Sequence, residues 1–240
     1  MPQNLTDEFL DLYRILEIEG KEKYFPKSGE GENIIGRLMN TPQLREYKED
    51  INYCRVVRNF LVHTPKVHQA YSIMPSPEMI QFLKDVIKEI KNPPLAKDYA
   101  IKINNMYTVS LKSNIVDVVR YMQTMGFTHV PVIEDGKIFG VFSANVLYTY
   151  LSKTNDEIKN FDTDLSLLAD YLPLHKHTNE YFAFVDKNTT LREVSQLFKI
   201  DVRSMKQLSA VFITENGHSD ERIQAMLTPY SILRDAPDLY

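Results

Sequence analysis

The residues best suited to chemistry lie near the end of a predicted helix, where Arg58 and Asn59 precede His63. A histidine can serve as general acid or base near neutral pH, and a fixed arginine charge, from Arg58 or Arg55, can stabilise a pentavalent phosphate. Asn59 would orient the phosphate or the histidine. If the substrate is RNA, a ribose 2′-hydroxyl would be the nucleophile and no metal would be required.

Helix geometry limits how these residues can cooperate. At about 100° per residue, Arg55, Asn59 and His63 share one stripe, whereas Arg58 and His63 point roughly 140° apart. Either the last helical turn unwinds before Pro65, or two chains place their stripes together across a two-fold axis. The structural alternative is a polar network that fixes the helix end or forms a dimer contact.

A second group of candidates consists of hydroxyl residues that open helices. Ser143 and Thr228 each follow an apolar strand pattern, and their hydroxyls with the adjacent backbone donors could hold a phosphate. The alternative is that both hydroxyls act only as helix caps. Arg203 and Lys206, just before a strand pair, could also meet a phosphate, although charges at a helix end are commonly just solvated.

These hydroxyls occupy matching places in an internal duplication, because residues 109–151 and 184–233 repeat one order of elements. Each copy predicts a short strand, an amphipathic helix, a pair of strands and a second helix. A repeat of this size indicates two half-modules that bury their faces against each other and leave clefts related by approximate two-fold symmetry. The expected strands are 109–111, 129–133 and 140–142 in the first copy, and 184–185, 209–213 and 226–227 in the second.

The connections between these elements differ. Asp135-Gly136 predicts a two-residue hairpin turn, because both residues tolerate positive φ. The second copy has a longer polar connection at 215–224, which we expect to be a floppy surface loop. A helix is expected around 165–172, in the segment that joins the copies.

The N-terminal third reads as helices. Thr6 can cap a first helix that Gly20 can close, and a later helix opens at Thr41-Pro42 and must stop near His63. Ser76-Pro77 opens the last helix of this region. Asn92-Pro93-Pro94 ends it, so we place the domain boundary there: residues 1–94, then 95–240, with repeat 1 at about 100–151, a linker at 152–180 and repeat 2 at about 181–236.

Composition narrows the class of protein. With 240 residues, 43% of them hydrophobic, the chain can bury a substantial core, and a net charge of −4 offers no overall basic field for DNA or anionic lipid. Any RNA contact must be local. No apolar run approaches the roughly 20 residues that span a bilayer, and the start of the chain lacks the features of a secretory signal, so a cytoplasmic protein without membrane contact is expected.

The cysteine and histidine residues form no cluster in the sequence that would support a metal site. The single cysteine, Cys54, cannot form an internal disulfide and should pack as a small apolar residue. His175 and His177 are two apart in a linker, and His63 and His68 lack neighbouring carboxylates or thiols. We therefore expect no metal site and interpret these as exposed histidines.

The C-terminal pattern, with Val130-Pro131-Val132 leading to Gly140-Val141-Phe142-Ser143 and with Leu227-Thr228-Pro229-Tyr230 in the second copy, resembles the CBS domain pair, or Bateman module, over roughly 100–236. The resemblance implies adenine-nucleotide binding in clefts between the repeats and an effect on a neighbouring domain. The family's ribose-binding aspartate, three residues after the hydroxyl, is replaced by Val146 and Ser231, so the Thr228 and Ser231 cleft is the better candidate. The ligand-binding candidates are Thr228, Ser231, Ser143, His129, Arg203 and Lys206.

The N-terminal helices resemble a HEPN domain in the arginine-x4-histidine spacing of Arg58 and His63 late in one helix, with a polar residue after the arginine and a further helix behind it. That resemblance implies a compact helical bundle and a composite dimer site. Some HEPN families are metal-independent ribonucleases, with Arg58, Asn59 and His63 then catalytic. Others are interaction or scaffold modules.

These observations predict an α+β protein in which an all-helical bundle precedes a tandem CBS α/β pair. The first hypothesis is a ligand-sensing regulatory protein whose CBS pair binds a small ligand such as ATP, ADP or AMP and modulates the helical domain. The resemblance implies a homodimer, and no cofactor is required. One alternative is a ribonuclease regulated by the CBS pair. Another is a dimeric scaffold with neither ligand nor activity.

Overall fold

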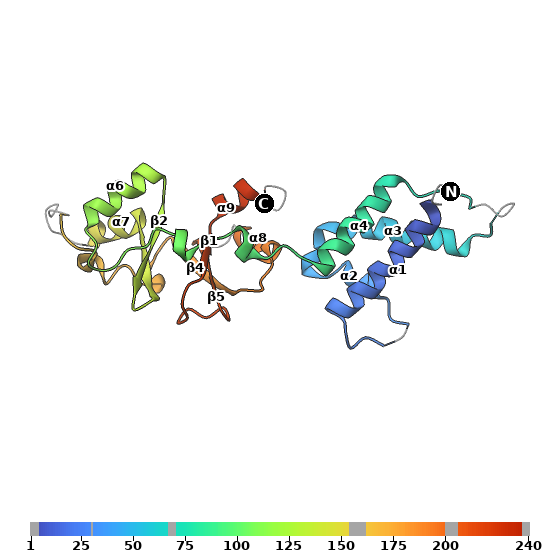
Figure 1. Cartoon of the computed structure of the whole chain (residues 1–240), viewed down its shortest axis with the longest axis horizontal. Coiled ribbons are helices and arrows are strands. Elements are labelled where there is room, and N and C mark those ends of the chain that lie inside the picture. The colour runs from blue at the N-terminus through green and yellow to red at the C-terminus, as the bar shows by residue number, and fades with distance from the viewer. Residues whose placement is uncertain (1–4, 30, 67–70, 154–161, 200–205, 237–240) are drawn as a thin grey trace. The chain divides into compact units, whose positions relative to one another are not determined.

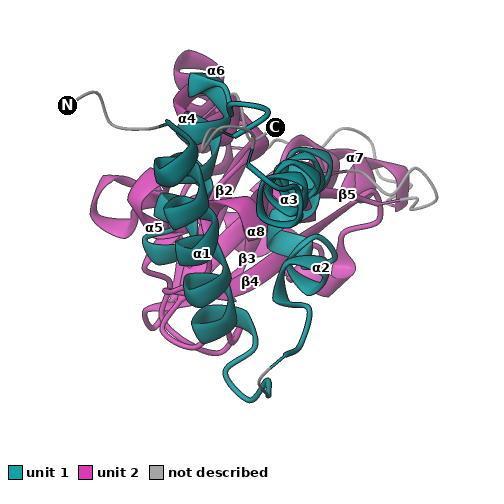
Figure 2. Ribbon diagram, turned by 90° about the vertical axis from the view of Figure 1, so that its right-hand side faces the viewer, with its two compact units in different colours: residues 1–94 teal, residues 95–240 magenta. Residues whose placement is uncertain are grey.

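The structure is a computed structural model that describes residues 5–29, 31–66, 71–153, 162–199 and 206–236. Its helices and strands are labelled along the chain in Figure 1. The chain divides into two compact units, residues 1–94 and 95–240, coloured separately in Figure 2. Each unit has its own buried apolar side chains, and each is described by itself below.

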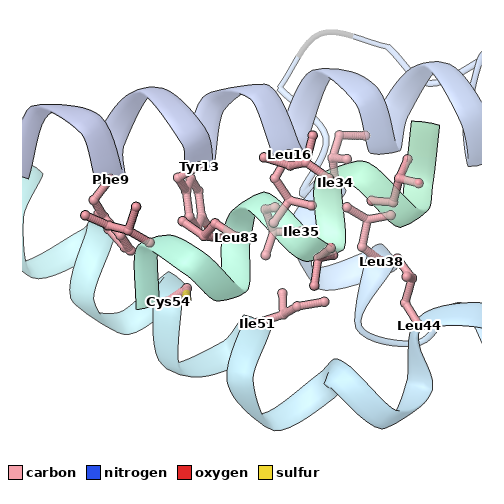
Figure 3. Close-up of a cluster of buried hydrophobic side chains, with 14 of the residues drawn as sticks. Phe9, Tyr13, Leu16, Ile34, Ile35, Leu38, Leu44, Ile51, Cys54 and Leu83 are labelled. Carbon is pink, nitrogen blue, oxygen red and sulfur yellow. The ribbon is translucent and has the colours of Figure 1, made fainter. Parts of the chain in front are cut away.

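The first unit is helical and is held by one apolar cluster. Phe9, Tyr13 and Leu16, at spacings of three and four, bury one face of the first helix, and Figure 3 shows them directed toward Leu83 and Cys54. Burial raises the pKa of the Cys54 thiol to about 12, as suits a packing residue. The helices are α1 (Leu5–Tyr24), α2 (Ile34–Leu38), α3 (Lys48–His63) and α4 (Pro77–Lys91), with a 3-10 helix at Pro42–Tyr47 before α3.

Local signals located some of the helix ends. The Ser76 side chain accepts a hydrogen bond from Met79 N at the start of α4, and α3 ends at His63 because Thr64, ahead of Pro65, is extended. Both predictions are confirmed. Gly20 does not close α1: the helix continues to Tyr24, and a Cβ at Gly20 would collide with the buried Leu38 side chain. This glycine therefore serves close helix packing.

The second unit is a mixture of helices and sheets. Figure 1 shows α6 and α7 beside β2, and α8 near β4 and β5. The elements are α5 (Ala96–Tyr99), β1 (Ile101–Lys102), α6 (Ile115–Met125), β2 (His129–Glu134), β3 (Lys137–Ser143), α7 (Ala144–Lys153), β4 (Glu180–Asp186), α8 (Leu191–Phe198), β5 (Gln207–Thr214), β6 (Ala225–Leu227) and α9 (Pro229–Asp235).

The two halves of this unit repeat one order, as predicted. In each half a helix (α6 or α8) leads to an antiparallel strand pair (β2 with β3, β5 with β6) and then to a second helix (α7 or α9). The second half adds β4, which runs parallel to β5. The expected strand at 109–111 is reduced to a single parallel bridge between Val109 and Val132, because the chain turns at once, with Ser113 N bonded to Ser110 O.

Three other expectations need correction. Residues 101–102 do not join the first half: β1 pairs with β6, so the four-stranded sheet has the order β1-β6-β5-β4. The helix expected around 165–172 is a 3-10 helix, Leu165–Leu168, followed by turns. The 215–224 connection is not floppy, since the Glu221 carboxylate accepts hydrogen bonds from the Asn216 backbone and side chain and from His218 N.

The hairpin turn of the first half is as predicted, with Asp135 at φ 51° and Gly136 at φ 76°. Close to it, Gly140 in β3 lies against the backbone of Leu172, whose carbonyl accepts a hydrogen bond from Val141 N at 3.0 Å. A Cβ at Gly140 would overlap that carbonyl group. The absence of a side chain at this position therefore lets the connecting segment pack on the hairpin.

Replacing Gly140 with alanine should lower the free energy of unfolding of the second unit by about 2–3 kcal/mol, because backbone atoms cannot yield as a side chain can. Urea unfolding followed by circular dichroism measures the change. Gly29→Ala is the control, since the nearest atom to its Cβ would be Glu32 Oε1 at 3.8 Å, and it should alter stability by less than about 0.5 kcal/mol. Equal stability of Gly140→Ala and the parent protein would contradict the packing argument.

Candidate functional site

The most connected polar group in the second unit is the carboxylate of Glu180, the first residue of β4. Its Oε2 accepts hydrogen bonds from His129 Nε2 and Asn145 Nδ2, both at 2.9 Å. Its Oε1 accepts from Ser143 Oγ at 2.6 Å and His177 Nδ1 at 2.7 Å. The Glu180 side chain is only 3% exposed, so four protein donors replace the water that an ionised carboxylate would otherwise bind.

These donors come from separate segments. His129 begins β2, Ser143 ends β3 and Asn145 lies in the first turn of α7, all in the first half, whereas His177 belongs to the connecting segment. Glu180 itself begins the second half. A single carboxylate therefore joins the two halves and the segment between them.

Both ring nitrogens of His177 face hydrogen-bond acceptors. Nδ1 faces the Glu180 carboxylate, and Nε2 lies 3.1 Å from the carbonyl oxygen of Leu172. Both partners only accept hydrogen bonds, so a neutral ring would leave a lone pair against an oxygen. The arrangement fits an imidazolium paired with the carboxylate. Phe182 packs edge-on against the ring at a centroid distance of 5.0 Å.

His129 has a different environment. Its Nδ1 lies 2.8 Å from Thr128 Oγ1, a hydroxyl that can donate, so a neutral ring satisfies both contacts. Burial by itself would raise the pKa of the Glu180 carboxyl. The hydrogen bonds from His129, His177, Ser143 and Asn145 outweigh burial and hold that pKa well below its usual range.

The structure gives several predicted site residues an internal partner. Ser143 and His129 bind Glu180, and Lys206 Nζ donates to the His177 carbonyl oxygen at 2.7 Å. His177 is buried, which corrects its interpretation as an exposed linker histidine; His175 is exposed as expected. The sequence analysis missed Glu180, and its one local signal was a carboxylate at the first position of a largely apolar strand.

The corresponding hydroxyls of the second half lie at the start of α9. Thr228 Oγ1 accepts a hydrogen bond from Ser231 N at 3.3 Å and lies 3.1 Å from Ser231 Oγ. Ser231 is buried and Thr228 is half-buried. Two hydroxyls share one hydrogen bond here, so one hydroxyl proton has no acceptor within the described part of the chain.

The candidate catalytic residues of the first unit are not brought together within one chain. The α-helix is unbroken to His63, which excludes the unwound last turn and keeps Arg58 and His63 on different faces. Arg58 Nη1 donates to Asn59 Oδ1 at 3.2 Å, and its guanidinium lies 5.7 Å from the centre of the Tyr13 ring. His63 is exposed, and Arg55 donates twice to Asn52 Oδ1.

The ligand-binding candidate Arg203 and the histidine His68, which was interpreted as exposed, fall outside the described residues. Within the ranges that the structure describes, no cluster of three or more His, Cys, Asp or Glu side chains is placed to hold a metal ion. None of the described helices combines the length and apolarity needed to cross a membrane.

Replacing Glu180 with glutamine should make the protein less stable at pH 7 by about 3 kcal/mol, because buried donors lose their charged partner. A depressed pKa stabilises the fold above the ordinary value of about 4.3, and this contribution is lost as pH falls further. The gap between the two proteins should therefore narrow from pH 5 downward in urea titrations. Asp117→Asn, at a 76% exposed side chain, should follow the parent profile. A gap that stays constant to pH 3 would contradict the assignment.

Comparison with known proteins identifies part of this unit. The CBS domain family model matches residues 96–153. Solved structures similar to the chain include a putative acetoin utilization protein, AcuB, from Vibrio cholerae, at 16% identity and TM-score 0.42 over 60% of this chain and 91% of that one. CBSX2 in complex with AMP is similar at 16% identity and TM-score 0.42, over 61% of this chain and 98% of that one.

CBSX2 from Arabidopsis thaliana, a CBS-pair protein, is similar at 17% identity and TM-score 0.40, with 62% of this chain and 97% of that chain covered. No curated protein sequence matches the chain. The family match lies outside the helical first unit, for which the HEPN resemblance stays a prediction. The chain contains a CBS domain at residues 96–153, within a C-terminal unit of mixed helix and sheet.

Proposed function

We propose that this protein is a ligand-sensing regulator whose C-terminal unit binds a small ligand, an adenine nucleotide, and modulates the N-terminal helical unit. The match of a CBS domain at 96–153 carries this proposal, because proteins with such domains are commonly ligand-sensing regulators. The repeated order of elements in the second half supports an extension of the module to residue 236.

The state of the hydroxyls favours the second half as the ligand site. In the first half the Ser143 proton goes to Glu180 and a valine, Val146, stands where a polar ribose contact would be needed. In the second half Thr228 and Ser231 retain one hydroxyl proton for an outside acceptor. A phosphate or ribose oxygen is an acceptor of the right kind.

Regulation adds a further requirement. A ligand shifts an equilibrium only when it binds two arrangements of the protein with different affinity. The helical first unit is the output in this proposal, and the ligand acts on it by favouring one of two arrangements of the second unit.

Calorimetric titration of the whole protein with ATP, ADP and AMP tests the sensor. We expect binding of at least one nucleotide and a loss of affinity of about 10- to 100-fold in Thr228→Val, since a hydrogen bond to a charged group contributes about 1.5–3 kcal/mol. Thr124→Val is the control: its hydroxyl donates to Arg120 O on α6, and affinity should not change.

The outcomes separate the alternatives. Absence of heat with all three nucleotides, for a folded protein, counts against the sensor and in favour of a scaffold. Binding that Thr228→Val leaves unchanged would move the site away from α9.

We keep a second candidate, a metal-independent ribonuclease formed by two chains, because α3 exposes an apolar stripe next to its histidine. Tyr53, Val56 and Phe60 are 61%, 52% and 43% exposed at spacings of three and four, and His63 continues the stripe. Packing of two such stripes would place Arg55 and Asn59, which border the stripe, near His63 of the other chain. Arg58 points to the opposite side of the helix, so the composite dimer site that the HEPN resemblance implies would take its cation from Arg55.

RNA incubated with the protein in EDTA should then be cleaved, and His63→Ala should reduce the rate at least about 100-fold, the usual contribution of a general acid or base. His175→Ala removes an exposed histidine from the other unit and should cleave at the parent rate. Equal cleavage by the parent protein and His63→Ala would identify a contaminating nuclease.

A further inference from the structure

We infer that Glu180 is an internal ligand: its carboxylate occupies an anion-binding position built by the first half and the connecting segment, and it keeps external anions out of that position. The inference deepens the proposed function, on which its consequence for nucleotide binding rests. The anion site itself stands on the geometry around Glu180 alone.

The first argument is the convergence of donors. Four side-chain donors, from His129, Ser143, Asn145 and His177, point at two oxygens within 2.6–2.9 Å. Such a set of nitrogen and hydroxyl donors suits any small oxyanion, because a carboxylate, a formate ion and a phosphate edge present similar acceptor pairs. The donors themselves have no feature that is specific for a glutamate side chain.

The second argument is charge. His177 presents both ring nitrogens to acceptors, the Glu180 carboxylate and the Leu172 carbonyl, and an imidazolium would satisfy both contacts. Lys206 Nζ lies 2.7 Å from the His177 carbonyl oxygen. Among the described residues that bind the Glu180 carboxylate, the titratable ones are His129 and His177, and each directs a ring nitrogen at it.

The third argument is attachment. Donors on β2, β3 and α7 belong to the first half, whereas the anion belongs to the first residue of the second half. Asn145 and Ser143 are also held by their own elements, Ser143 by pairing with His129 in the β2–β3 ladder. The carboxylate therefore comes from a different segment of the chain than most of the donors that bind it. Removing the carboxylate leaves those donors in place.

In the proposed sensor this occupant limits the module to one nucleotide per chain. The Ser143 proton, which would meet a phosphate in the first half, already has an acceptor at 2.6 Å. The Thr228 and Ser231 pair in the second half has no such carboxylate among its hydrogen-bond partners in the described residues.

The test is chemical rescue of Glu180→Ala by sodium formate. Thermal unfolding is followed by circular dichroism in formate and in sodium chloride at equal ionic strength. We expect formate to raise the Tm of Glu180→Ala by about 2–4 °C relative to chloride, because a ligand that binds only the folded state stabilises it. Inorganic phosphate is a second probe, and a rise with phosphate shows that the position also accepts the larger oxyanion.

Glu180→Gln is the matched control. Its side chain fills the same space without a charge, so formate should raise its Tm no more than that of the parent protein. Should Glu180→Ala be unfolded in chloride, the expected result is recovery of the folded signal in formate. An equal Tm in both salts, or an unfolded chain in both, overturns the inference. A similar rise in Glu180→Gln also overturns it, since it shows a general salt effect.

The nucleotide arm is separate. If the parent protein binds ATP at one site per chain, Glu180→Ala should bind it at two, and a stoichiometry that stays at one would restrict the opened position to small oxyanions. Formate rescue without any ATP binding would sustain the anion site and count against the sensor. ATP binding without formate rescue would support the sensor and overturn the anion site.

Discussion

A buried carboxylate must satisfy both of its oxygens within the protein, and the second unit is organised around one that does. Glu180 begins the second half, and its donors lie on β2, β3 and α7 of the first half and in the connecting segment. Each donor can reach the carboxylate only if its own element is in place. Apolar contacts within each cluster do not depend on direction, whereas the hydrogen bonds to Glu180 do. These hydrogen bonds therefore fix how the elements are oriented.

The hydrogen bonds to Glu180 give the two duplicated halves different polar environments. Their elements follow the same order, and a hydroxyl begins the second helix in both, but the environments of the two hydroxyls have diverged. Ser143 gives its proton to an internal acid, whereas Thr228 shares a hydrogen bond with Ser231 inside its own turn. A duplicated scaffold thereby holds one position closed and leaves the other with unused hydrogen-bonding capacity. Both residues carry a hydroxyl, so the neighbouring groups decide which hydroxyl can donate to a ligand.

Much of the fold could be predicted because its signals are local. The Asp135-Gly136 turn, the Ser76 cap and the end of α3 before Pro65 depend on a few consecutive residues. The features that the sequence did not predict are contacts between residues far apart in the chain. Nothing near Gly140 reveals that Leu172 packs on it, and nothing near His177 reveals Glu180's other donors. Periodicity reports which face is buried, but not which polar groups meet there.

In the first unit, the geometry of one helix limits which residues can act together. An unbroken α3 fixes the angle between Arg58 and His63, so the two side chains cannot act on one phosphate from the same helix. Apolar side chains at Tyr53, Val56 and Phe60 remain exposed beside His63, while the inward face of α3 contributes Ile51, Cys54 and Leu61 to the core. Joint action of Arg58 and His63 would therefore need one of the two from a second chain. The exposed apolar stripe borders His63 but lies on the side of the helix away from Arg58, so association through this stripe would bring Arg55 and Asn59, not Arg58, to the histidine of a second chain.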